Sequence, residues 1–106
     1  MSDLGIVVYR PGREPGTLEA DWYSDELDRK VVCKGVAKGG IPGRIEGDYK
    51  VFYCGPDDED DDCFDLSIEK EGEIFVGRWF EKGKFIYHGF GIVIDGGIAM
   101  AWQKVK

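Results

Sequence analysis

The sequence has few of the residues on which catalytic and metal sites are built. Its 106 residues include one histidine, His88, and three cysteines. Serine occurs three times, and no serine stands in a G-x-S-x-G nucleophile elbow. The cysteines and His88 lack the closely paired spacing of a zinc site. We therefore expect a non-enzymatic protein that uses no metal and no cofactor.

Long hydrophobic runs and an excess of basic residues are also missing. No apolar run reaches the about 18 residues of a membrane-spanning helix, and the start, MSDLGIVVYRPG, lacks the order of a signal peptide. The net charge is −7, and nucleic acid or an anionic membrane would require a basic surface. We expect a cytoplasmic protein with reduced cysteines and neither kind of partner.

What the sequence does have is regular alternation of apolar and polar residues, without the recurrence of an amphipathic helix. Residues 73–102 contain three strand-like runs joined by glycine-bearing turns, as in a β-meander. Earlier strands are predicted at residues 6–10, 17–23, 29–38, 44–54 and 64–70, with residues 1–16 forming a short strand and a turn-rich link. Eight short strands predict a single all-β domain over residues 1–106. Its form is an antiparallel up-and-down barrel, because closure removes exposed strand edges.

One face of the predicted strands collects aromatic rings and glycines. The rings either form a cup for a planar or apolar ligand or simply fill the barrel, and alternation supports both interpretations. The inward rings are Trp22, Tyr49, Tyr53, Trp79, Tyr87 and Trp102.

The other face of the late strands is unusually apolar. Such a surface either joins copies of the chain or is covered by the N-terminal segment, and we expect a homo-oligomer. The predicted interface residues are Ile74, Val76, Ile86, Phe90, Ile92 and Ile94.

Six consecutive acids, DDEDDD, occupy residues 57–62. They lack the spacing of a calcium-binding loop. We expect a solvated hairpin tip or a patch for a basic protein partner. Cys54 and Cys63 flank this run, and the sequence leaves open whether they form a disulfide.

Four motifs resemble the avidin branch of the calycins, a group of small β-barrels that includes avidin-like and lipocalin-like proteins. They are Asp21-Trp22-Tyr23-Ser24, Gly47-Asp48-Tyr49, FVGRWF at residues 75–80 and Met100-Ala101-Trp102. The resemblance implies an eight-stranded meander barrel with a ligand cup at one open end. It places the ligand-contacting positions of the family at Ser24, Asp28, Tyr49, Val51, Trp79, Phe85 and Trp102.

Polar groups of that family are largely replaced here. Ser24 stands where the family has Asn, Asp28 where it has Ser, and Val51 and Phe85 where it has hydroxyl residues. Since a site loses several kcal/mol when its polar partners are missing, we expect no biotin binding. The last strand of the family also has no counterpart, and residues 6–10 closing against residues 98–104 would replace it.

Two functions follow as hypotheses, beside the possibility of a barrel that holds no ligand and acts only as a structural subunit. The first is non-enzymatic binding of a small apolar or aromatic molecule, with Trp22, Tyr49, Trp79 and Trp102 as walls and Ser24 and Asp28 at the rim. The second is an acidic protein-interaction or inhibitor module that uses residues 57–62 and the apolar outer face.

Overall fold

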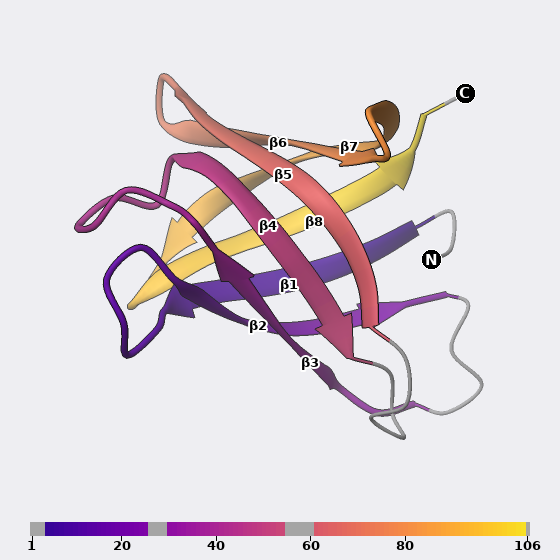
Figure 1. Cartoon of the computed structure of the whole chain (residues 1–106), viewed down its shortest axis with the longest axis horizontal. Coiled ribbons are helices and arrows are strands. Elements are labelled where there is room, and N and C mark those ends of the chain that lie inside the picture. The colour runs from indigo at the N-terminus through magenta and orange to yellow at the C-terminus, as the bar shows by residue number, and fades with distance from the viewer. Residues whose placement is uncertain (1–3, 26–29, 55–60, 106) are drawn as a thin grey trace.

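The computed structural model describes residues 4–25, 30–54 and 61–105, and these form a closed barrel of eight antiparallel strands (Figure 1). Within this part of the chain, no helix is long and apolar enough to span a membrane. Consecutive strands are neighbours all the way round, so the prediction of an all-β up-and-down barrel is confirmed. The barrel is consistent with a calycin-like architecture. The strands are β1 (Leu4–Pro11), β2 (Leu18–Ser24), β3 (Cys33–Lys38), β4 (Gly47–Cys54), β5 (Asp61–Glu71), β6 (Ile74–Glu81), β7 (Lys84–Ile94) and β8 (Gly97–Lys104).

The two ends of the barrel differ in their connections (Figure 1). We call one the terminal end, because β1 starts there and β8 finishes there; the β2–β3, β4–β5 and β6–β7 connections lie at the same end. The opposite end, which we call the turn end, carries the four remaining connections. Since β2, β4, β6 and β8 run towards the terminal end, the last inward residues of these strands gather there.

Strand β1 closes the barrel by pairing on both edges. It is antiparallel to β8, with Gly5 opposite Trp102, and antiparallel to β2, with Gly5 opposite Ser24. The hypothesis that residues 6–10 close against residues 98–104 is therefore confirmed. The alternation of β1 explains this position, because Val7 and Tyr9 are buried while their neighbours face outward. The strand also supplies hydrogen-bond partners to two edges that would otherwise be open.

Three strands begin three or more residues away from their predicted starts. Strand β3 begins at Cys33 rather than at residue 29, because Val31 and Val32 are exposed and pair with no strand in the described chain. Strand β4 begins at Gly47 rather than at residue 44. Strand β5 begins at Asp61, three residues early, so the backbone of the last two acids of the 57–62 run belongs to a strand. The rest of that run lies outside the described residues, and Cys63 is a free, exposed thiol.

A tight turn and a β-bulge correct two predicted side-chain directions. Lys82 and Gly83 both have positive φ, 51° and 79°, as in a type I′ hairpin turn. This turn pairs Phe80 with Phe85, whereas Trp79 pairs with Tyr87, so Ile86 is the extra residue of the bulge.

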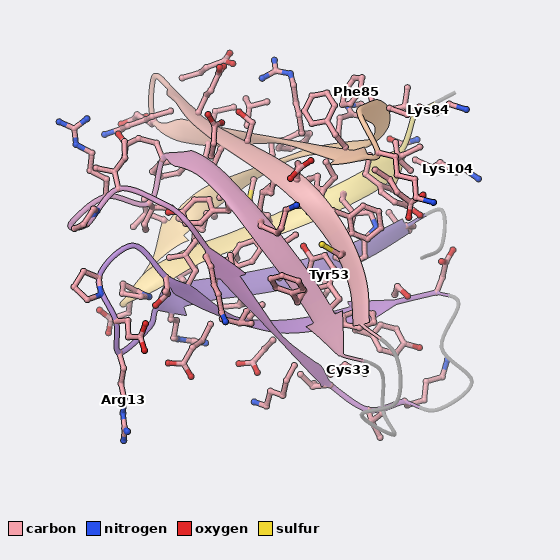
Figure 2. The ribbon with its side chains drawn as sticks, in the orientation of Figure 1. Arg13, Cys33, Tyr53, Lys84, Phe85 and Lys104 are labelled. Atoms are coloured by element: carbon pink, nitrogen blue, oxygen red, sulfur yellow. The ribbon has the colours of Figure 1, made fainter. Side chains whose placement is uncertain are left out.

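The predictions that Phe85 faces the lumen and that Ile86 faces outward are therefore wrong. Phe85 is 40% exposed and lies 5.3 Å from the Phe80 ring, while Ile86 is half-buried against the core. Figure 2 shows Phe85 near Lys84 at the outer edge of the barrel. The bulge is what allows Trp79 and Tyr87 to stay inside although the turn forces Phe80 and Phe85 outside.

The interior is filled by placing small residues beside large ones. One row of paired residues crosses β1 to β4 in the order Tyr9, Ala20, Gly35 and Tyr53. The two tyrosines face each other across the lumen because Ala20 and Gly35 between them take up little space. Trp102 likewise has Gly89 on one side and Gly5 on the other. This alternation lets large rings share a narrow lumen, as expected for eight strands.

Candidate functional site

The terminal half of the barrel contains one connected group of rings, which we call the aromatic cluster. Neighbouring ring centroids lie 5.6 to 6.5 Å apart, within the range of favourable aromatic contacts. Trp79 has 0% exposure, so solvent does not reach it. The rings thus fill this part of the lumen, as in the second of the two interpretations. The members are Trp22, Tyr53, Phe64, Trp79, Tyr87 and Trp102.

A chain of hydrogen bonds runs through the centre of this cluster. The indole N–H of Trp79 donates to the Tyr53 hydroxyl at 2.8 Å, and the hydroxyls of Tyr53 and Tyr9 are hydrogen-bonded to each other. All three side chains are buried. Buried polar groups normally need such partners, because they have lost water. Tyr53 (Figure 2) therefore holds the chain together, since both bonds pass through its oxygen.

The buried tyrosines of this hydrogen-bond chain make the stability of the fold decrease at alkaline pH. Burial raises the pKa of Tyr9 well above 10.0, and the neighbouring Tyr53 raises this pKa further. Burial also raises the pKa of Tyr53, although the hydrogen bonds with Tyr9 and Trp79 partly offset this rise. The unfolded chain loses both protons near pH 10, but the barrel keeps them. Stability is therefore complete below pH 10 and falls above it, by up to about 1.4 kcal/mol per pH unit for each phenol.

Urea unfolding at a series of pH values checks this expectation. The free energy of unfolding of the wild type should decline above pH 10. That of Tyr9→Phe should decline less steeply, because one buried phenol has been removed. Equal slopes for the two proteins would contradict it.

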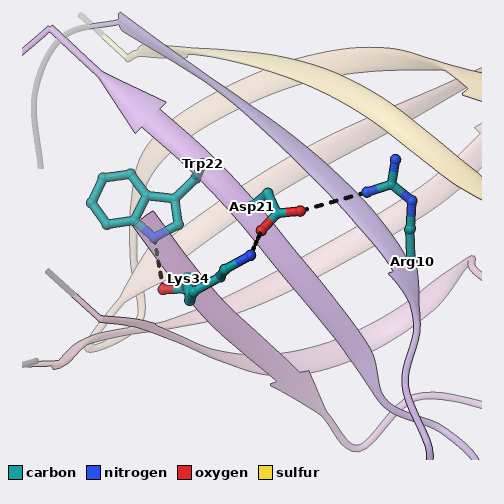
Figure 3. A network of polar contacts seen from close by, with 4 residues as sticks. All are labelled: Arg10, Asp21, Trp22 and Lys34. Atoms are coloured by element: carbon teal, nitrogen blue, oxygen red, sulfur yellow. Dashed lines mark hydrogen bonds and ion pairs between the residues drawn. The ribbon is translucent and has the colours of Figure 1, made fainter. Parts of the chain in front are cut away.

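Two of the three indole N–H groups donate hydrogen bonds within the barrel. Trp22 donates to the backbone carbonyl of Lys34 at 2.9 Å (Figure 3). On the outside of the same strands, the Asp21 carboxylate forms ion pairs with Lys34 and with Arg10, the latter at 3.5 Å. These surface pairs contribute little, about 0 to 1 kcal/mol each. The N–H groups of Trp22 and Trp79 are thus satisfied within the barrel.

Trp102 is the exception. Its side chain is 1% exposed, and within the described residues its Nε1 is the buried side-chain nitrogen without a hydrogen-bond partner. A Cβ added to Gly5 would lie 2.0 Å from Trp102 Cζ2 and 2.5 Å from Cε2, so the six-membered ring of the indole packs over this glycine. On its other side Gly5 pairs with Ser24, whose buried side chain points into the same end of the lumen. An indole donor and a serine hydroxyl therefore flank Gly5 at the terminal end.

The structure brings five of the predicted ligand-contacting residues together and separates others. Trp22, Ser24, Trp79, Tyr87 and Trp102 all lie inside the terminal half.

Three further predicted residues lie elsewhere. Tyr49 donates its hydroxyl to the Ile45 carbonyl at 2.7 Å, in the connection at the turn end. Its pKa is raised by burial and, to a smaller degree, by Glu46. Val51 is buried between Ala37 and Phe64, and Phe85 is outside. Asp28 lies outside the described residues.

Two residues of the site were missed from the sequence. Tyr9 belongs to the hydrogen-bond chain, but residues 6–9 are all apolar in sequence, so no alternation indicated that Tyr9 faces inward. Gly5 leaves space for Trp102, and nothing in the sequence alone indicates which ring lies over it.

A separate pocket of about 370 Å³ opens outside the lumen. It lies over β3 to β6, and Lys38, Lys50, Asp65 and Phe80 are among the residues that line it. Lys50 and Asp65 are 3.7 Å apart and form an ion pair across the pocket wall. These two charges therefore have each other as partners.

The fold and the site define a closed eight-stranded β-barrel with a buried aromatic cluster in its terminal half. No protein-family model matches the chain, and no curated protein or solved structure matches it. The resemblance to avidin-like barrels thus rests on the four motifs and on the barrel itself.

Proposed function

We propose that the barrel binds a small, planar, neutral molecule that carries a hydrogen-bond acceptor, at the terminal end beside Trp102. The observation that supports this most is the buried indole N–H without an acceptor. Leaving such a donor unsatisfied costs about 1 to 3 kcal/mol, which a ligand carbonyl or ring nitrogen would recover. Native proteins retain few such groups, and each calls for an explanation.

The surroundings of Trp102 define the class of ligand. Trp22, Tyr53 and Trp79 pack against the Trp102 ring, with centroids 6.2 to 6.5 Å away, so its surroundings are aromatic and favour an aromatic or apolar ligand body. Ser24 is the only buried polar residue outside the aromatic set in the described chain, so the lumen offers no charged group to pair with an ion. A neutral ligand therefore fits best, since an unpaired buried charge is costly.

Binding at this place requires a small rearrangement. Trp102 is almost fully enclosed, so a ligand reaches Nε1 only when a side chain at the terminal end moves aside. Complexes that require such a change form more slowly than rigid ones. Tryptophan fluorescence during ligand mixing should therefore change with a resolved slow phase.

The experiment uses the three tryptophans as reporters. A library of small planar carbonyl and heteroaromatic compounds is screened by NMR, observing the three indole N–H signals. Binding compounds should move the Trp102 signal most, because its N–H gains an acceptor, while the N–H groups of Trp22 and Trp79 keep theirs. Compounds that move the signals of Trp22 or Trp79 but not that of Trp102 would count against the proposal, as would a library without any binder.

Trp102→Phe tests the same proposal through affinity. The change keeps an aromatic ring but removes the donor, so affinity for an acceptor-bearing compound should fall about tenfold. The free protein should stay folded, because the lost N–H makes no hydrogen bond in it. Ser24→Ala is the companion variant beside Gly5, with a smaller expected loss. Isothermal titration measures both, and unchanged affinity in Trp102→Phe would refute the role of this donor.

A further inference from the structure

The outside of β1, β7 and β8 forms a continuous apolar surface, which we call the outer apolar face. Two rows of directly opposed residues cross these strands, and both are free of charge. Phe90 is 66% and Ile6 60% exposed, and Ile92 is exposed to a similar degree. The two rows are Ile6, Ala101 and Phe90, and Val8, Ala99 and Ile92.

The N-terminal strand extends this face instead of covering it. Because β1 is paired edge to edge between β8 and β2, Ile6 and Val8 add to the surface. The alternative that the N-terminal segment shields the late strands is therefore wrong for β1.

On the other side, Val76 pairs with Phe90 and continues the first row onto β6. Of the residues predicted for an interface, Ile74 is exposed, Val76 and Ile94 are half-buried, and Ile86 is turned towards the core.

The charge distribution singles out this face within an acidic chain. The protein carries 21 Asp and Glu, yet β1, β7 and β8 contain none of them. Two copies with a net charge of −7 repel each other over most of their surfaces. They approach most easily where both are apolar and free of acids. A basic partner protein would instead need acidic groups here.

The shape of the face also suits a second copy. Ala99 and Ala101 on β8 form a shallow trough between larger side chains on β1 and β7. Under a twofold axis, the Phe90 and Ile92 ridge of each copy lies in the alanine trough of the other, as an isologous interface requires. The side chains of Ile6, Ile74, Phe90 and Ile92 alone expose on the order of 400 Å², about half of what each partner buries in a standard stable interface.

From these observations we infer that the chain forms a symmetric homodimer through the outer apolar face. The inference is independent of ligand binding, because the face lies on the opposite side of the strands from the aromatic cluster. It also follows that the dimer should strengthen at higher salt, since salt screens the repulsion between the two acidic barrels and leaves the apolar contact intact.

Sedimentation velocity on the full chain at micromolar concentration tests this inference. The expected species is about 24 kDa, twice the 11.9 kDa of one chain. Phe90→Glu should give a folded monomer, because it adds a charge to each side of the contact at an exposed position. Ile6→Glu, across the trough, should do the same. Val32→Glu is the matched control: Val32 is also 66% exposed but lies outside the face, and this variant should stay dimeric.

Circular dichroism establishes that each variant is folded. A wild-type monomer at these concentrations would overturn the inference. Dimers that persist in both Phe90→Glu and Ile6→Glu would also overturn it, because the contact would then lie elsewhere. A monomer that binds anionic lipid vesicles and loses that binding in Phe90→Glu would replace the second copy with a membrane as the occupant of this face.

Discussion

Tyr53→Phe is expected to lower the free energy of unfolding by about 2 to 4 kcal/mol, although it removes a single oxygen atom. That oxygen accepts the hydrogen bond from Trp79 Nε1 and is bonded to the Tyr9 hydroxyl. Without it, two buried polar groups lose their partner at once, and each such loss costs about 1 to 3 kcal/mol. Urea unfolding followed by tryptophan fluorescence measures the difference, and the Trp79 indole signal should move in the NMR spectrum.

Tyr23→Phe is the matched control for this substitution. The Tyr23 hydroxyl lies at the surface and accepts a bond of 3.3 Å from Lys30 Nζ. Water replaces such a partner, so the expected change is within about 0.5 kcal/mol. A loss for Tyr53→Phe no larger than that of Tyr23→Phe would show that the buried chain of hydrogen bonds contributes nothing to stability.

Gly89→Ala is expected to have the second large effect, a destabilisation of about 3 kcal/mol or more. An added Cβ at residue 89 would lie 1.8 Å from the Ala101 carbonyl oxygen and 2.9 Å from Trp102 Cα. Both atoms belong to the backbone of β8, which cannot rotate out of the way as a side chain does. The barrel would have to separate β7 from β8, and overpacking of this severity usually costs 1 to 3 kcal/mol or more.

Gly12→Ala is the corresponding control, in the connection between β1 and β2. There the close atom is the Oγ1 of Thr17 at 2.3 Å, which belongs to a side chain that can rotate. We expect a loss of about 1 kcal/mol or less, because Thr17 gives up its bond to the Glu14 carbonyl. Thermal unfolding of the two variants side by side measures the contrast. Similar melting temperatures would mean that β7 and β8 have room which the structure does not show.

Much of the fold was predictable from local pattern. Alternation placed Trp22, Trp79 and Trp102 on one inward face, and the resemblance, whose last strand has no counterpart here, suggested that residues 6–10 close the barrel against residues 98–104. The direction of Phe85 was not predicted, because simple alternation does not include a bulge. Yet the two-residue turn at Lys82 and Gly83 contained a signal: it forces Phe80 and Phe85 to the same side, so alternation had to break before Tyr87.

The candidate site was predictable only in part. Alternation identified which rings share the lumen, but it did not distinguish a filled interior from a cup. That distinction depends on how far each ring reaches across the barrel and on which small residue faces it. Tyr49 illustrates the limit, because it faces inward as predicted and yet its hydroxyl is bonded to a loop carbonyl at the turn end.

The sequence by itself determined that eight alternating strands close into one barrel with the aromatic residues inside, because a period of two residues fixes which side of a strand is buried. Only the tertiary structure decided which buried polar atoms find partners. Trp79 reaches Tyr53 and Trp22 reaches the Lys34 carbonyl, whereas Trp102 reaches no acceptor in the described part of the chain. The physical reason is that a difference of a few tenths of an ångström in the distance between donor and acceptor decides whether a hydrogen bond forms, and alternation carries no information about these distances.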